Sequence, residues 1–272
     1  MYKAFMFGRP SIIVTKPEVC KKILMDDDNF ELGWPQTVLK LIGKKSLHGI
    51  TSQEHKQIRQ LTTSPIKGKH ALCLYLGLIE EVVKSSFEKW DAIKEEEPIE
   101  FLSELKKATF EVIIRIMMGS EIDPQWLDMV EKVYKIYLKG FLALPINMPG
   151  FAYHRAFKVR WYTIPKGWKV LTWIRQINLD PNNYVNPKEF NPSRWDDDEA
   201  KPFSVFLPFG AGPRLCPRAE LARLEVSVFL HYFLLNYRLE RLNPETSVTY
   251  LTIPSPTDNC LARLKRVSRS CQ

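Results

Sequence analysis

The sequence has no pair of cysteines close enough to form a Cys-x-x-Cys motif. Its five cysteines, at positions 20, 73, 216, 260 and 271, are odd in number and far apart. An odd, scattered set argues against a disulfide framework, and the lack of close pairs argues against a structural zinc site. We therefore expect free thiols and a reducing compartment.

Long apolar runs are also missing. The first residues, MYKAFMFGRPSIIV, lack the basic-then-apolar order of a signal peptide, and no window of about 18 uncharged apolar residues occurs anywhere. We expect a chain that does not span a membrane and that has no N-terminal anchor. Internal repeats and low-complexity tracts are absent as well.

The charge balance is basic, with a formal net charge of +8, but the lysines and arginines form no block or arm. No zinc-finger, RNP-type or basic-zipper pattern is present, so we expect a solvated surface and no nucleic-acid binding. Contact with acidic partners, or peripheral contact with anionic lipid, is compatible with this charge. The 272 residues, 45% of them apolar, are enough to bury a sizeable core.

The residue pattern predicts a mainly α-helical protein with small β-sheets. A hairpin is expected from residues 3–7 and 11–14, followed by a short helix over 17–25 with proline in its first turn. A helix over 51–61 begins with capping-box spacing between Thr51 and Glu54. Longer amphipathic helices are expected over 71–90, 100–118 and 124–139.

The residue pattern changes from helical to strand-like and proline-rich after Arg160. Residues 162–164 and 169–174 favour strands, and residues 181–208 contain five prolines and almost no periodicity, which is typical of a functional loop. The last helix, over 219–235, is apolar on nearly every side from Val226 onward. We therefore expect this helix to be buried.

Between that loop and that helix lies Cys216, in the stretch PFGAGPRLCP. Gly210 and Gly212 allow close approach of a flat ligand, and a helix starting just after Cys216 would favour a thiolate. A thiolate serves in nucleophilic catalysis, redox sensing or haem ligation, whereas a lone cysteine is more often a small buried hydrophobe. None of the five histidines completes a cysteine-protease pattern.

The stretch from Pro208 to Pro217 resembles the haem-binding motif of the cytochrome P450 family, whose Phe, Gly, Arg and Cys match Phe209, Gly212, Arg214 and Cys216. The resemblance implies that Cys216 is the axial ligand of haem iron, that Arg214 contacts a propionate and that Phe209 packs near the sulfur. Arg218 departs from the family, which usually has glycine there, and a long side chain at this position would crowd the porphyrin edge.

Two other stretches are similar to the same family. EHKQIR resembles the helix that supplies a further propionate contact, which implies this role for His55 and Arg59, four residues apart on one helix face. The alternative for this pair is an ordinary exposed helix face. FNPSRW resembles the segment before the haem loop, in which Arg194 would bind a glutamate and an arginine of an earlier helix.

Within the family, segments such as LIGKKSLHGI, NMPGFAYHRAFK and PTDNCLAR resemble plant ent-kaurenoic acid oxidases of gibberellin synthesis, and SPIKGKHALCLYL leans toward the related β-amyrin oxidases. The resemblance implies oxidation of a terpenoid, with haem b as cofactor and dioxygen as co-substrate. Electrons would come from NADPH through a cytochrome P450 reductase. Relatives sit on the endoplasmic reticulum, whereas a chain without the anchor is also compatible with the cytoplasm.

Two family motifs are missing from the sequence: the Ala/Gly-Gly-x-Asp/Glu-Thr motif of the oxygen-activating helix and a Glu-x-x-Arg motif before Arg194. We assign no catalytic residue for this reason. The family pattern breaks between Arg160 and Trp161, which divides the chain into residues 1–160, with the first hairpin and early helices, and 161–272, with the haem loop and last helix. Exon skipping, a gene-model error or a decaying gene copy would explain the break. A second hypothesis for the function is therefore a non-catalytic protein that binds haem or is vestigial.

Overall fold

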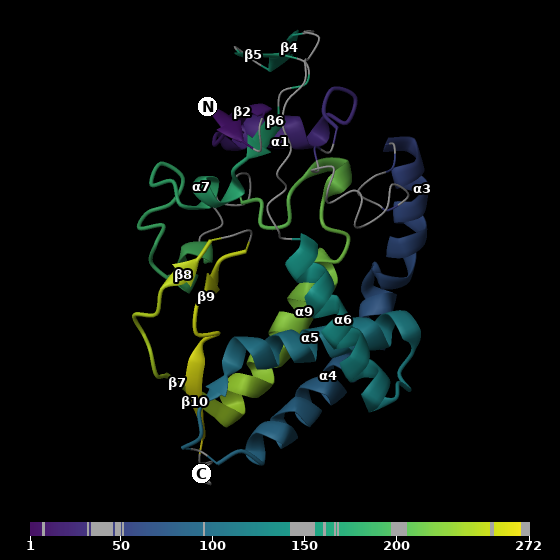
Figure 1. Ribbon diagram of the computed structural model, residues 1–272, viewed down its shortest axis with the longest axis vertical. Helices are drawn as coiled ribbons and strands as arrows, with labels where there is room; N and C mark the ends of the chain where they lie inside the picture. Colours follow the sequence, from purple (N-terminus) through teal and green to yellow (C-terminus); the bar gives the residue numbers. More distant parts are fainter. Residues whose placement is uncertain are drawn as a thin grey trace. The chain divides into compact units, whose positions relative to one another are not determined.

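The computed structural model describes residues 1–6, 9–31, 33, 46, 50, 52–94, 96–141, 156–159, 162–165, 167, 169–196, 206–250 and 253–267. Helices dominate these residues and the strands are short, so the predicted mainly α class with small β-sheets is confirmed (Figure 1). The chain forms two compact units: a sheet unit of residues 1–61 and 144–217, and a helical unit of residues 62–143 and 218–272. Each unit takes residues from both sides of position 160, and the division of the sequence there stays a prediction.

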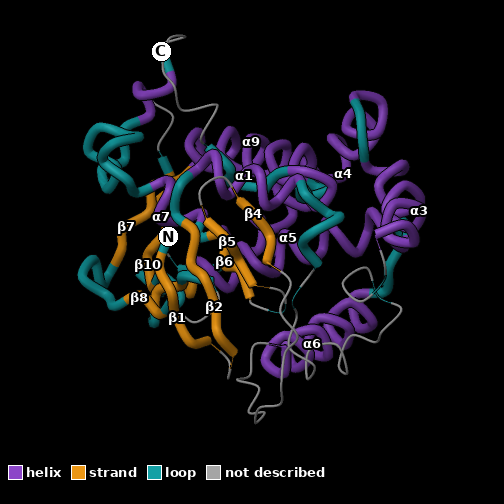
Figure 2. The backbone as a smooth tube through the Cα atoms, turned by 90° about the horizontal axis from the view of Figure 1, so that it is seen from above, coloured by secondary structure: helices purple, strands orange, loops and turns teal. Residues whose placement is uncertain are grey.

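In the sheet unit, β1 (Tyr2–Met6) and β2 (Arg9–Val14) form the predicted antiparallel hairpin. β6 (Lys169–Thr172) joins the other edge of β2 in parallel, and the three strands lie side by side in Figure 2. The predicted helix α1 (Pro17–Met25) has proline at its start, where no backbone N–H is needed. Its apolar face packs with the sheet and with α7 (Ile174–Asn178) in a core of Val14, Val19, Cys20, Ile23 and Ile177.

The rest of the sheet unit differs partly from the sequence prediction. β5 (Tyr162–Pro165) is one of the predicted strands, but its partner β4 (Ala156–Val159) was not predicted. The second predicted strand ends early, because Ile174 begins α7. The proline-rich segment holds a short 3-10 helix, η2 (Pro192–Trp195), and residues 197–205 lie outside the described part of the chain.

The four long predicted helices are present with boundaries close to the expected ones. They are α4 (Lys69–Asp91), α5 (Phe101–Met118), α6 (Pro124–Phe141) and α9 (Ala219–Asn236). α3 (Ser52–Thr63) also forms and continues into the 3-10 helix η1 (Ser64–Ile66), whereas Thr51 of the predicted capping box is outside the described residues. α5 ends at Gly119, whose φ of 109° is a conformation that glycine adopts without strain.

The core of the helical unit is aromatic. Six rings from α4, α5, α9 and the strand that follows α9 have centroid separations between 5.1 and 6.4 Å, within the range for favourable ring packing. These rings belong to Phe87, Trp90, Phe101, Phe229, Phe233 and Tyr237. Segments far apart in the sequence are therefore joined by one cluster.

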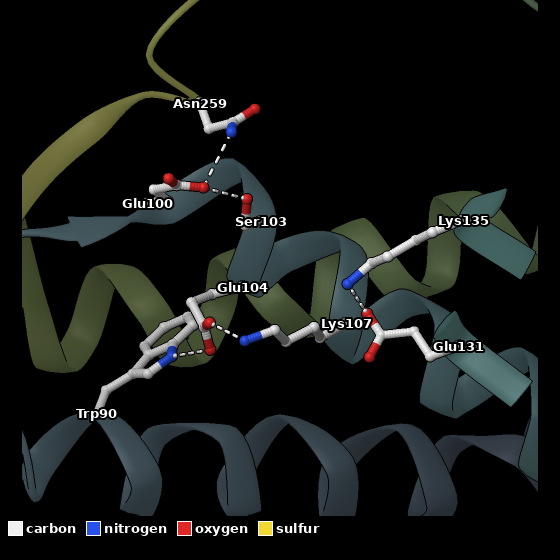
Figure 3. Close-up of polar contacts among 8 residues, drawn as sticks. All are labelled: Trp90, Glu100, Ser103, Glu104, Lys107, Glu131, Lys135 and Asn259. Atoms are coloured by element: carbon white, nitrogen blue, oxygen red, sulfur yellow. Dashed lines mark hydrogen bonds and ion pairs between the residues drawn. The ribbon is translucent and has the colours of Figure 1, made fainter. Parts of the chain in front are cut away.

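A small sheet that sequence reasoning missed closes one end of this core. Its strand order is β3 (Ile99–Glu100), β10 (Leu261–Arg266) and β7 (Tyr237–Arg241), and a separate pair joins β8 (Val248–Thr249) to β9 (Ser255–Pro256). Figure 3 shows how the start of α5 is tied to the turn before β10. There Glu100 accepts hydrogen bonds from Ser103 Oγ at 2.7 Å and Asn259 Nδ2 at 2.9 Å, and these bonds lower the pKa of Glu100.

A second polar group in Figure 3 joins α4 to α5. Trp90 Nε1 donates to Glu104 Oε2 at 3.4 Å, and Lys107 Nζ lies 2.6 Å from Glu104 Oε1. The indole nitrogen of a ring in the aromatic core therefore has a polar partner at the edge of that core, as a largely buried tryptophan requires.

The predicted burial of α9 is wrong for one of its faces. Leu221, Val228 and Phe233 are buried, but Val226, Leu230 and Leu234 are 56%, 44% and 68% exposed. Their spacing of four residues places them in one stripe along the helix. α4 packs against α9, and no described element covers the stripe, so an apolar helix is left half-exposed. None of the helices over the described residues has the length and apolar character to cross a bilayer.

Candidate functional site

The loop that carries Cys216 is closed on itself within the sheet unit. The backbone N–H of Cys216 donates to the carbonyl of Phe209 at 3.0 Å, and the N–H of Leu215 donates to Gly212 O at 3.0 Å across the 3-10 helix η3 (Gly212–Arg214). Cys216 is half-buried, and α9 begins three residues later, which confirms the predicted helix start. The thiol therefore sits at the end of a hydrogen-bonded turn.

The two glycines of the loop have different reasons to be glycine. Both have positive φ, 81° at Gly210 and 72° at Gly212, where a side chain is strained. At Gly212 a Cβ atom would also lie 2.9 Å from Met25 Cα and closer still to the carbonyl oxygen of Leu24. The last residues of α1 therefore support the loop directly. Sequence reasoning missed this contact, since nothing local links residue 24 to residue 212.

This packing predicts a difference between two otherwise similar substitutions. Gly210→Ala and Gly212→Ala both place a Cβ at positive φ, but at Gly210 a Cβ would meet no described atom within 4 Å. We expect Gly212→Ala to lose about 1–3 kcal/mol more stability than Gly210→Ala, because it must also displace the α1 backbone. Urea unfolding of the two variants measures this, and equal midpoints would contradict the close approach.

α3 reaches the same loop through Arg59. Its Nη2 donates to the carbonyl oxygen of Leu215, the residue before the cysteine. His55, one turn earlier, is only 5% exposed, so the alternative of an ordinary exposed helix face is wrong for this histidine. Arg214 is half-buried at the end of η3. The structure thus gives Arg59 a direct contact with the loop that contains Arg214 and Cys216.

These residues fit a haem group. The donors include one half-buried thiol, the single protein ligand that a haem-thiolate iron requires, and the side chains of His55, Arg59 and Arg214 are nitrogen donors of the kind that binds carboxylates. Over the described residues, no three His, Cys, Asp or Glu side chains gather as a metal-binding cluster. A Cβ atom at Gly210 would meet no described atom within 4 Å, so the space directly beside this backbone is open.

Arg194 has partners that the sequence did not suggest. Its Nε donates to Asn191 O at 3.1 Å, and its Nη2 donates to Glu189 O at 2.7 Å and Asn186 O at 3.2 Å. The predicted partners, a glutamate and an arginine of an earlier helix, have no counterpart in the sequence. The guanidinium instead satisfies three carbonyls of its own turn, which holds residues 186–194 together locally.

Arg218, the residue that departs from the family pattern, lies at the N-cap of α9. Within the helical unit its Nη2 is 3.5 Å from the Sδ of Met117 on α5. It also acts on Glu225, a residue that sequence reasoning missed. Burial raises the pKa of Glu225 to about 7, the charge of Arg218 opposes this rise, and Glu225 Oε1 is buried without a hydrogen-bond partner over the described residues.

Glu225 predicts a pH dependence of stability. Because its pKa is raised in the folded chain, the native state binds the proton more tightly than the unfolded state, whose pKa is near 4.5. The stabilisation is therefore present at low pH and is lost as the pH rises through about 7. We expect the Tm of the protein to fall from about pH 5.5 to about pH 8 relative to that of Glu225→Gln. Parallel Tm profiles for the two proteins would contradict the shift.

Comparison with known proteins agrees with the motif at Cys216. The family model for cytochrome P450 matches residues 1–155 and 152–258. Ent-kaurenoic acid oxidase 2 of Arabidopsis thaliana is 34% identical over 98% of this chain and 82% of its own length, and beta-amyrin 11-oxidase of Glycyrrhiza uralensis is 32% identical over 98% and 83%. The solved retinoic-acid-bound cyanobacterial CYP120A1 has the same fold, with a TM-score of 0.78 at 18% identity, over 98% of this chain and 91% of that one.

The alignments also show an internal gap. The first of these runs over 407 positions, 135 more than the 272 residues of this chain, so at least that many positions of the relative have no counterpart here. The two blocks of the family match meet at residues 152–155, a few residues before the break that the sequence predicts at Arg160. The residues present therefore come from both sides of a missing central segment.

Proposed function

Because the chain belongs to the cytochrome P450 family, we propose that it is a haem-thiolate monooxygenase that oxidises ent-kaurenoic acid. The family's cofactor is haem with an axial cysteine thiolate, supplied with electrons by a reductase. The proposal of this substrate rests on the 34% identity to an ent-kaurenoic acid oxidase over nearly the whole chain. A diterpene acid would thus be oxidised stepwise toward a gibberellin precursor.

Each predicted site residue has a role in this proposal. When bound, haem supplies a thiolate-ligated iron that activates dioxygen for insertion into an unactivated C–H bond. Cys216 would provide the thiolate, and the hydrogen bond from its N–H to Phe209 O holds its backbone. Arg59, His55 and Arg214 would hold the haem carboxylates, and Gly212 keeps the loop close to α1.

The test is a carbon monoxide difference spectrum combined with turnover. The full chain is loaded with haem, reduced in the presence of carbon monoxide, and then incubated with NADPH, a plant cytochrome P450 reductase and ent-kaurenoic acid. The proposal expects a thiolate-type band and an oxidised diterpene acid by mass spectrometry. A thiolate-type band with product from another terpenoid only would exclude this substrate.

A triterpene is the second candidate substrate. Beta-amyrin 11-oxidase is 32% identical to this chain over the same coverage, only two percentage points below the diterpene acid oxidase. β-Amyrin lacks the carboxylate of ent-kaurenoic acid, so the two compounds differ in charge as well as size. Parallel incubations with each compound at equal concentration separate the two candidates, since the preferred substrate is the one consumed.

A haem-binding protein without turnover is a candidate from another class. It is favoured by the absence of the oxygen-activating Ala/Gly-Gly-x-Asp/Glu-Thr motif from the sequence and by the uncovered apolar stripe of Val226, Leu230 and Leu234. If the protein binds haem without turnover, we expect the same assay to give the thiolate-type band with no product from either terpenoid. Consumption of NADPH without product would support it further.

We also propose that the protein acts at the surface of the endoplasmic reticulum with a cytochrome P450 reductase. The support is the family resemblance and the net charge of +8, which favours approach to an acidic reductase or an anionic membrane. Because such attraction is screened by salt, the rate of haem reduction by the reductase should fall as ionic strength rises. A rate independent of salt would exclude docking driven by this charge.

A further inference from the structure

The peptide bond between Leu215 and Cys216 is held from both sides. Its carbonyl oxygen accepts a hydrogen bond from Arg59 Nη2, and its N–H donates to Phe209 O at 3.0 Å. Arg59 and Leu215 are 156 residues apart in the sequence, so the contact joins α3 to the cysteine loop across the sheet unit. One peptide group therefore connects the Arg59 guanidinium to the hydrogen bond that closes the loop and to Cys216 itself.

Two such bonds on one peptide group strengthen each other. A guanidinium at the carbonyl oxygen draws electron density toward it, which makes the N–H of the same peptide a better donor. A hydrogen bond to a charged group is also stronger than a neutral one. The cation of α3 therefore acts on the bond between Cys216 and Phe209 through the Leu215–Cys216 peptide group.

We propose that Arg59 is a positioning residue that sets the Leu215–Cys216 peptide and keeps the cysteine loop closed before haem arrives. The inference rests on haem binding at Cys216 as proposed above, and it adds a second task to the carboxylate contact implied for this arginine. Because five N–H donors lie in a planar fork, one guanidinium can hold the loop carbonyl and still offer donors to an anion. Haem then meets a closed loop and spends less binding energy on ordering it.

Hydrogen exchange of the Cys216 amide tests the proposal in the haem-free full chain. Removal of the Arg59 contact should let the loop open more often, so Arg59→Ala is expected to exchange this amide about tenfold faster. Lys56→Ala is the matched control, because Lys56 is exposed on the same helix. In this variant the Cys216 amide should exchange as fast as in the unaltered chain. An unchanged rate in Arg59→Ala overturns the proposal.

Conservative variants separate the contact from the general stability of α3. Arg59→Lys keeps a charged donor and should restore part of the protection, whereas Arg59→Gln keeps the length without the charge and should restore less. If circular dichroism shows that Arg59→Ala does not fold, the proposal is tested by comparing protection of the Cys216 amide in Arg59→Lys, Arg59→Gln and Lys56→Ala. Equal protection in the lysine and glutamine variants and the unaltered chain would overturn the role of the cation.

Hemin dimethyl ester distinguishes the new task from a carboxylate contact, because both haem carboxylates are capped in it. We expect Arg59→Ala to weaken binding of the ester as well as of hemin, by about tenfold for the ester, since the loop must be ordered in both cases. Weaker binding of hemin with unchanged binding of the ester would leave only the carboxylate contact and overturn the positioning role. Failure of the unaltered chain to bind either compound would instead count against the proposed function.

Discussion

Cys216→Ser is expected to abolish the thiolate-type absorption band of the reduced, carbon monoxide-bound protein and to lower hemin affinity by at least about tenfold. A serine hydroxyl keeps its proton at neutral pH and is a poor ligand for haem iron, whereas the closed loop and α1 remain in place to hold the backbone. The measurement is a hemin titration followed by the difference spectrum after reduction. Activity, where present, should disappear with the band.

Cys73→Ser is the matched control for this prediction. Cys73 lies exposed on α4 in the helical unit, outside the loop, so its replacement should leave both the spectrum and the hemin affinity unchanged. A haem nitrogen-ligand spectrum in Cys216→Ser would show that the pocket still forms without the sulfur. Uptake of hemin with an unaltered thiolate-type band in Cys216→Ser would place the ligand elsewhere and remove the basis of the site.

Local features of the site could be read from the sequence because they depend on neighbouring residues. The start of α9 just after Cys216 follows from helix signals within a few residues, whereas the two glycines indicated close approach of the backbone but not the positive φ that the structure shows. The helices α4, α5 and α6 were predictable for the same reason, since their apolar periodicity extends over several turns.

Contacts between distant segments could not be read in this way. The partner of Arg59 is 156 residues away, and the clash that makes Gly212 necessary comes from Leu24. The strands β3 and β9 contain two residues each, too few for a periodic pattern, and β4 is recognisable only by its pairing with β5. These features depend on which elements meet in space, which a single sequence does not state.

The exposed stripe on α9 was mispredicted for a related reason. An all-round apolar helix normally implies burial on every side, and the sequence of α9 is of that kind. In this chain the alignments leave at least 135 positions of a relative without a counterpart, while α9 itself is retained. The composition of α9 therefore fits more neighbours than the described residues provide.

Phe233→Ala is expected to destabilise the helical unit by about 3–5 kcal/mol. The ring of Phe233 is 6% exposed and lies 5.3 Å from the rings of Phe101 and Phe229, so its removal leaves a cavity at the centre of the aromatic core. Whole domains are stable by only about 5–15 kcal/mol, so this loss is a large part of the total. The variant should therefore unfold at a much lower urea concentration, measured by the loss of the helical signal in circular dichroism.

The next residue along α9 supplies the control. Leu234 is 68% exposed, so Leu234→Ala removes a side chain of similar chemistry from the same helix without opening a cavity, and its effect should stay within about 0.5 kcal/mol. The contrast between the two variants depends on which face of α9 is covered, since both substitutions change helix propensity in the same direction. A loss of more than about 2 kcal/mol at Leu234 would mean that the stripe is covered in solution, and equal midpoints would contradict the packing of α9 against α4 and α5.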